Sequence, residues 1–220
     1  MIRVLGRCLG KRGFPVLAID LVGFGESDDP DLPLPEGFRS EDAVASFVRL
    51  AWEEGWVGPE GILYVGHSLG AGVVLRAGRL DPCPRAIVAI GGPTMHDWTQ
   101  RQGPAWLRHF AHERFDDMGL GPVADDASLR VMERYLLEMD PIEAIAHLEG
   151  VISILLIYGE QEDTKIRTLS PPSPAARYAL HVVPGAPHAF RCERLARGMI
   201  LLYDRAMLES IVHAIEEIAS

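Results

Sequence analysis

Residues 66–70 read Gly-His-Ser-Leu-Gly and directly follow the apolar run 61–65. Such a run predicts a buried strand, and the residues after the motif favour a helix. A serine between two glycines at this junction suits a tight strand-to-helix turn that exposes the hydroxyl for nucleophilic attack. We expect both glycines to be needed, because the turn brings backbone close to backbone. Ser68 is therefore the candidate nucleophile.

A developing oxyanion would need hydrogen-bond donors beside that serine. The first N–H groups of a helix have no acceptor within the helix and can hold a negative charge. The N–H of Leu69, the residue after the nucleophile, is the candidate donor.

A serine hydroxyl is a weak nucleophile unless a base lies within hydrogen-bond reach and an acid orients that base. In a sheet of this type the three groups are expected after strand ends, in the chain order serine, acid, histidine. Gly-Glu-Gln-Glu-Asp at 159–163 follows one apolar run, and Pro-Gly-Ala-Pro-His at 184–188 follows the next. His188 is the candidate base. Glu162 and Asp163 remain equal candidates for the acid, whereas Glu160 fits a turn.

The elements that must position these groups alternate between strands and helices. Strands are predicted at 14–19, 61–67, 85–90, 152–158 and 179–183. Helices are predicted near the N-terminus, from 41 with Ser40 as N-cap, over 69–80, from Pro104, over 127–139, from Pro141, and over 193–219.

Apolar strands that alternate with helices predict an α/β fold with a mostly parallel sheet covered by helices on both faces. Residues 93–149 contain no strand pattern, so we expect a helical insertion there. The predicted organisation is a discontinuous core of residues 1–92 and 150–220, interrupted by a helical cap at 93–149.

Composition excludes several classes of function. The chain has 220 residues and a net charge of −10, which argues against nucleic acid as a partner. No apolar run is long enough for a membrane span. Three cysteines without a C-x-x-C pattern, and no apolar signal region, favour a cytoplasmic protein with reduced thiols. No spacing typical of metal ligands is present, so we expect neither metal nor cofactor.

Four motifs in this order resemble those of the α/β-hydrolase family and span most of the chain. They are Asp-x-x-Gly-x-Gly-x-Ser at 20–27, the motif at 66–70, Tyr-Gly-Glu at 158–160, and the segment 184–188. The resemblance implies Ser68 as nucleophile, His188 as base and the segment 93–149 as a cap that shapes the substrate pocket. The family's first strands, and a loop that supplies a second oxyanion donor, would lie before residue 1.

The function implied is a cofactor-independent serine hydrolase with a small-molecule acyl substrate. An apolar cap favours a small or medium hydrophobic ester, thioester or related acyl compound. Ser68 argues against dehalogenases and epoxide hydrolases of this fold, which would carry an aspartate at the turn. The alternatives are a truncated or non-catalytic binding protein of the same fold, and an acyltransferase.

Overall fold

The computed structural model describes residues 2–24, 26–58, 61–80, 84–121, 124–148, 152–169, 178–188, 190–194, 201–203 and 205–219. Its centre is a four-stranded sheet in the order β1-β2-β3-β4. The strands are β1 (Leu63–His67), β2 (Ala86–Ile90), β3 (Ser153–Gly159) and β4 (Tyr178–Val183). Every neighbouring pair is parallel, which confirms the predicted fold class.

The sheet is buried on both faces. All five residues of β2 are buried, as expected for a strand covered from both sides. Its side chains alternate between two hydrophobic clusters: Ile87 and Ala89 belong to one, and Val88 and Ile90 to the other. This two-residue period follows from the pleat of a strand. Two layers of helices therefore enclose the sheet.

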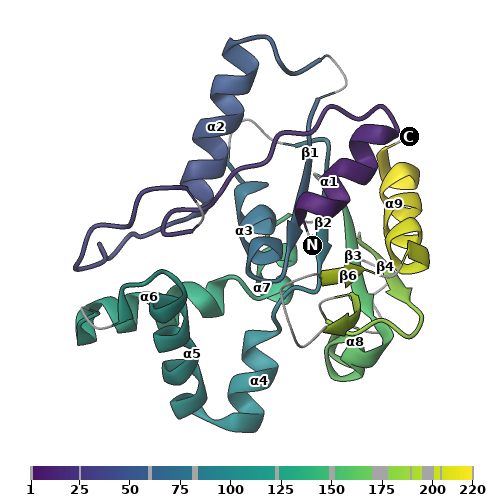
Figure 1. The fold of residues 1–220 in the computed structure, drawn as a ribbon. Helices are drawn as coiled ribbons and strands as arrows, with labels where there is room; N and C mark the ends of the chain where they lie inside the picture. The colour runs from purple at the N-terminus through teal and green to yellow at the C-terminus, as the bar shows by residue number, and fades with distance from the viewer. Residues whose placement is uncertain are drawn as a thin grey trace.

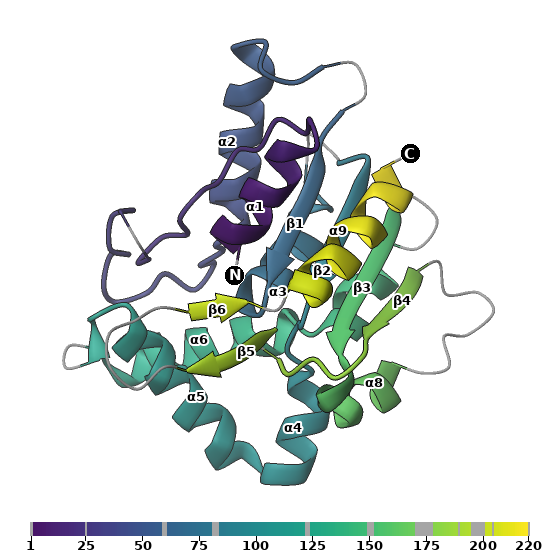
Figure 2. The same ribbon diagram turned by 45° about the vertical axis from the view of Figure 1, so that its right-hand side comes forward.

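One face is covered by α1 (Ile2–Lys11) and α9 (Arg205–Ala219), which lie side by side in Figures 1 and 2. The predicted N-terminal helix is thus confirmed, and its buried residues are Leu5 and Leu9. On the other face, α3 (Leu69–Ala77) packs against β1 and β2, and α2 (Glu41–Glu53) packs on α3.

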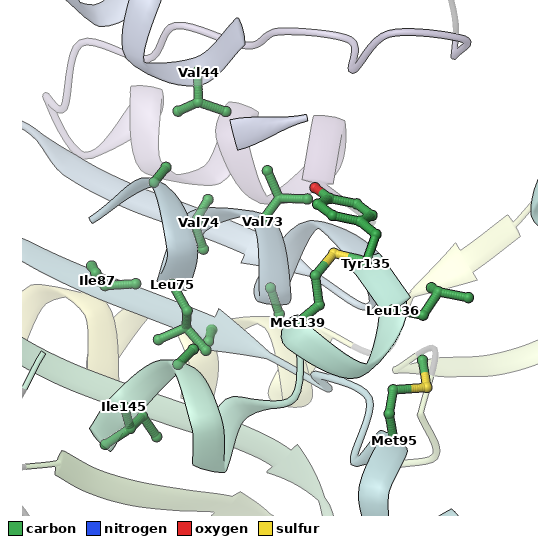
Figure 3. Packing of buried hydrophobic residues seen from close by; sticks show 14 of the residues in the cluster. Val44, Val73, Val74, Leu75, Ile87, Met95, Tyr135, Leu136, Met139 and Ile145 are labelled. Carbon is green, nitrogen blue, oxygen red and sulfur yellow. The ribbon is translucent and has the colours of Figure 1, made fainter. Parts of the chain in front are cut away.

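Four helices connect β2 to β3: α4 (Met95–Gln102), α5 (Pro104–Asp117), α6 (Asp126–Glu138) and α7 (Pro141–Ala146). Three of them were predicted, and α4 was missed. The helices α4, α5 and α6 gather below the sheet in both views (Figures 1 and 2). The end of α6 packs on α3, because Met139 fills the space that a side chain at Gly72 would need. Figure 3 shows Met139 and Tyr135 beside Val73 of α3.

Two short elements follow β3: a 3-10 turn η2 (Glu160–Glu162) and α8 (Asp163–Leu169). The predicted helix over 193–219 is wrong in its first part. An antiparallel pair, β5 (Arg191–Arg194) and β6 (Leu201–Tyr203), precedes α9. Short segments suit strands and helices equally, and here the pairing of β5 with β6 a few residues further on replaces the start of the helix.

The predicted strand at 14–19 is also absent. These residues form no strand, and Val16 and Leu17 keep 44% and 46% of their surface exposed. A strand needs a neighbour that binds its N–H and C=O groups, and β1 is paired with β2 alone among the described strands. Ser40 likewise makes no side-chain cap at the start of α2, although that helix begins as predicted.

Candidate active site

The candidate residues lie at the carboxyl ends of the parallel strands. Ser68 follows β1 directly, Glu162 ends the turn after β3, and His188 follows β4 after the four residues 184–187. Strands that run in the same direction bring these ends to one edge of the sheet, where open α/β folds bind ligands. The chain order serine, acid, histidine therefore becomes one cluster in space.

The turn at Ser68 is strained. Ser68 has φ 55° and ψ −121°, a conformation that non-glycine residues rarely adopt. A Cβ atom at Gly66 would lie 2.1 Å from the Gly70 carbonyl oxygen, so only glycine fits there. A Cβ at Gly70 would meet no atom within 4 Å, so the expectation that both glycines are sterically required is wrong for Gly70. The Ser68 N–H donates to the Ile90 carbonyl (2.8 Å), which ties the turn to β2.

Three side chains form a continuous hydrogen-bonded series. Ser68 Oγ lies 3.1 Å from His188 Nε2, and His188 Nδ1 lies 2.7 Å from Glu162 Oε1. If the Ser68 hydroxyl donates to Nε2, the ring proton is on Nδ1 and donates to the carboxylate. This arrangement can pass the serine proton to the imidazole and hold the ring in the required tautomer.

Glu162 is buried, with 4% of its side chain exposed, whereas 43% of the His188 side chain is exposed. Burial alone would raise the pKa of Glu162. Hydrogen bonds from His188 and Lys165, the charge of Lys165 and the N–H of Gly159 outweigh it and lower this pKa to about 2. The Gly159 N–H donates to Oε2 at 3.0 Å. Glu162 therefore remains an anion over the whole range in which a histidine titrates.

Asp163, the other candidate acid, is not brought to His188. Its carboxylate pairs with Arg167, four residues along α8, at 2.6 Å between Oδ2 and Nη2. The side chain is 62% exposed. The two acids are adjacent in sequence, yet only Glu162 contacts the imidazole: it ends η2, whereas Asp163 begins α8 and pairs with Arg167 along that helix.

Leu69 is the first residue of α3, so its N–H belongs to the helix end that lacks intrahelical acceptors. Its side chain lines a cavity between α3 and the helices that follow β2. The other lining residues are Val22, Phe24, Phe38, Ser40, Arg114, Met118, Met132, Tyr135 and Met139. The cavity wall is thus mainly apolar and reaches the residue beside the candidate nucleophile.

Two neighbours of His188 complete the site. The His67 ring stacks on the His188 ring at 5.5 Å between centroids. Burial lowers the pKa of His67 to about 4, so this ring is neutral near pH 7. Gly91, with φ 58°, leaves room for the imidazole, since a Cβ there would lie 3.1 Å from His188 Cε1. No sequence pattern indicated this role for Gly91.

Lys165 is the residue that sequence reasoning missed. Its Nζ lies 2.7 Å from Glu162 Oε1 and 3.3 Å from His188 Nδ1, and 12% of its side chain is exposed. The signal available was its spacing: three residues after Glu162, on the same side of a helical turn.

Within the described part of the chain, no three His, Cys, Asp or Glu side chains are placed to hold a metal ion. None of the described helices is long and apolar enough to cross a bilayer.

Comparison with known proteins places the fold. A model of the alpha/beta hydrolase family matches residues 3–196. Solved structures with a similar fold include DcsB in complex with a substrate analogue, at 14% identity and a TM-score of 0.59, with 100% of this chain and 84% of that chain covered. A soluble variant of monoglyceride lipase from Saccharomyces cerevisiae has 12% identity and a TM-score of 0.55, with 91% and 75% covered. The meta-cleavage product hydrolase CumD has 16% identity and a TM-score of 0.53, with 97% and 84% covered. No curated protein matches the sequence.

Proposed function

The chain belongs to the alpha/beta hydrolase family, and we propose that it is a serine hydrolase that cleaves acyl substrates through an acyl-enzyme on Ser68. One observation carries the proposal. Ser68 Oγ, on a strained turn, lies 3.1 Å from an imidazole whose other nitrogen lies 2.7 Å from a buried carboxylate. A nucleophile, its base and the group that orients the base are thus within hydrogen-bond reach of one another.

The proposed reaction has two halves. His188 Nε2 accepts the Ser68 proton while Oγ attacks the acyl carbonyl, and the resulting oxyanion is held by the N–H of Leu69. The imidazolium then protonates the leaving group as its bond to the acyl carbon breaks. In the second half water loses a proton to His188, attacks the acyl-enzyme and releases the acid, and the proton returns to Ser68. Glu162 stays ionised and stabilises the imidazolium in both halves.

The proposed substrate class is a small or medium hydrophobic ester, thioester or related acyl compound. Its support is the cavity beside Leu69, whose wall includes Phe24, Met118 and Met132. Methionine side chains are flexible and adapt to irregular apolar groups. An apolar acyl chain would therefore find contacts along most of this wall, in which Arg114 is the one charged residue.

We also propose that residues 93–149 act as a cap over a core formed by residues 1–92 and 150–220. The support is that the cavity is lined from both parts, with Leu69 on one side and Met132 on the other. A cytoplasmic location is part of the same proposal. Three cysteines are too few and uneven in number for a disulfide framework.

The test is labelling by a fluorophosphonate probe, which reacts with activated serines. We expect the wild-type protein and Ser46→Ala to be labelled and Ser68→Ala to remain unlabelled. Ser46 is a matched control, because it is exposed on α2 and remote in sequence from the turn. Hydrolysis of p-nitrophenyl acetate, butyrate and octanoate by the same three proteins then measures the preference for acyl length.

A wild-type protein that is folded by circular dichroism but remains unlabelled would overturn the proposal and favour a binding role. Labelling that survives in Ser68→Ala would overturn the assignment of the nucleophile. Ester cleavage that depends on an added alcohol or thiol acceptor, and not on water, would favour acyl transfer over hydrolysis.

A further inference from the structure

Lys165 occupies an unusual place for a cation. Its ammonium group lies 2.7 Å from Glu162 Oε1, the same oxygen that lies 2.7 Å from His188 Nδ1. The two nitrogens are 3.3 Å apart. The proposed catalytic carboxylate is therefore shared between the imidazole and a lysine.

In the tautomer in which His188 can act as base, Lys165 Nζ and His188 Nδ1 cannot hydrogen-bond to each other. When Nε2 accepts from Ser68, Nδ1 carries a proton and is a donor. An ammonium has three donors and no acceptor. Both groups thus donate to Glu162 Oε1, and the contact between them is one of two donors.

A positive charge at this distance opposes a second one. Proton transfer from Ser68 turns His188 into an imidazolium, whose charge Glu162 stabilises and Lys165 destabilises. Lys165 is mostly buried, so water screens this repulsion less than it would at the surface.

The other groups around His188 do not supply this effect. His67, at the end of β1, faces the ring and is held neutral by burial near pH 7. Tyr158, from β3, lies under the lysine with 6.0 Å from Nζ to the ring centroid, and burial raises the pKa of its hydroxyl. Among the described residues that the contacts place around His188, the facing charges are therefore those of Glu162 and Lys165.

We propose that Lys165 is a positioning residue that shares Glu162 with His188 and keeps the imidazole unprotonated, and so able to act as base, under more acidic conditions than Glu162 alone would allow. This inference rests on the proposed serine hydrolase function. This arrangement has two consequences. The unprotonated imidazole of His188 is available at lower pH, but the imidazolium that forms when His188 accepts the Ser68 proton is stabilised less.

The experiment is the pH dependence of kcat/KM for p-nitrophenyl butyrate in the wild type, Lys165→Met and Lys165→Arg. Removing the like charge removes the repulsion that opposes the imidazolium form of His188. We therefore expect the acid limb to move up by about one pH unit in Lys165→Met. At pH values well below that limb, the kcat/KM of Lys165→Met, relative to its own plateau, is expected to be about tenfold lower than that of the wild type. Lys165→Arg keeps the charge and restores the wild-type limb.

Arg167→Met is the matched control. Arg167 lies on the same helix, two residues further on, and its ion pair with Asp163 is exposed. Its loss removes one positive charge from α8 but none from the catalytic carboxylate. We expect its acid limb to coincide with that of the wild type.

A second measurement separates this inference from the proposed function. Nuclear magnetic resonance follows the titration of the His188 ring without turnover, with His188→Asn to assign the signal. If Lys165→Met raises the midpoint while the wild type cleaves no ester, the inference stands and the proposed function fails. If esters are cleaved but neither the midpoint nor the acid limb moves, or Arg167→Met moves them equally, the inference is overturned.

Discussion

Glu162 and Glu41 are both buried glutamates. Each accepts hydrogen bonds from one cationic side chain and from one side chain with a ring, but they belong to different parts of the molecule. Glu162 binds Lys165 and His188 at the end of the sheet. Glu41, on α2, accepts from Arg76 Nε of α3 at 2.7 Å and from the Tyr135 hydroxyl of α6 at 3.0 Å. The cluster of Glu41, Arg76 and Tyr135 therefore joins three helices.

The two clusters differ in whether their partners can exchange a proton. Burial and the neighbouring Glu41 raise the pKa of the Tyr135 hydroxyl. Burial would lower the pKa of Arg76, but the hydrogen bond and charge of Glu41 raise it. Both partners thus keep their protons at neutral pH. In the other cluster the ring is a histidine, the side chain whose ordinary pKa lies nearest neutrality, and it is 43% exposed.

Burial of a carboxylate beside a cation therefore does not by itself mark a catalytic site. In the Glu41 cluster Arg76 Nε and the Tyr135 hydroxyl both donate to Glu41, and Arg76 also binds the Glu138 carboxylate at 2.8 Å. It is built to hold α6 against α3. The Glu162 cluster leaves one imidazole nitrogen for Ser68 and for solvent.

Glu162→Gln gives the largest expected effect. The amide can still accept from the Gly159 N–H, but it no longer stabilises an imidazolium or fixes the ring tautomer. We expect kcat/KM for p-nitrophenyl butyrate to fall by about 10³–10⁴-fold. Asp163→Asn is the control, because its carboxylate binds Arg167 and not His188. Equal losses in the two variants would contradict the assignment of the acid.

Glu41→Gln is expected to act on stability and to leave kcat/KM nearly unchanged. The substitution leaves the buried Arg76 guanidinium with a neutral partner where it had a charged one. Breaking a buried ion pair of this kind costs about 3 kcal/mol. Urea unfolding measures this loss, and Glu36→Gln, whose side chain is 91% exposed, is the control. A variant that unfolds like the wild type would show that the cluster does not hold the helices together.

The sequence was sufficient to predict the sheet of β1 to β4, because each strand is an apolar run bounded by clear turn residues. It was also sufficient to place Ser68, His188 and a carboxylate pair at its carboxyl edge. It could not decide between Glu162 and Asp163, because one residue of a 3-10 turn reverses which side chain faces inward. The strand predicted at 14–19 failed for a related reason: apolar character is local, whereas pairing depends on a neighbour. The spacing of Lys165 from Glu162 is local, but the contact of Lys165 with His188 and that of Glu41 with Tyr135 depend on tertiary packing that no local pattern encodes.

The smallest of the expected effects concerns His67 and the pH dependence of the free energy of unfolding. Burial lowers its pKa to about 4, while in the unfolded chain it lies near 6.5. As the pH falls below 6.5, His67 gains a proton in the unfolded chain, whereas in the folded protein it does not accept one until about pH 4. The contribution of neutral His67 to the free energy of unfolding is therefore present above pH 6.5 and is lost on acidification. Between pH 7 and pH 5 the expected contribution to the loss is about 2 kcal/mol. Arg76 and Tyr135 keep their protons over this range, so neither of these two side chains contributes to the loss.

Urea unfolding at pH 7 and pH 5 measures the difference in the wild type and in His67→Gln. The variant should lose less stability on acidification than the wild type, by the amount that His67 contributes. His147→Gln, at an exposed position after α7, controls for the loss of an imidazole. If His67→Gln and the wild type lose the same stability, then the acid sensitivity does not originate beside the His188 ring. His188 would then be the one residue that distinguishes the Glu162 cluster, whose ring can exchange a proton, from the Glu41 cluster, whose Arg76 and Tyr135 keep their protons.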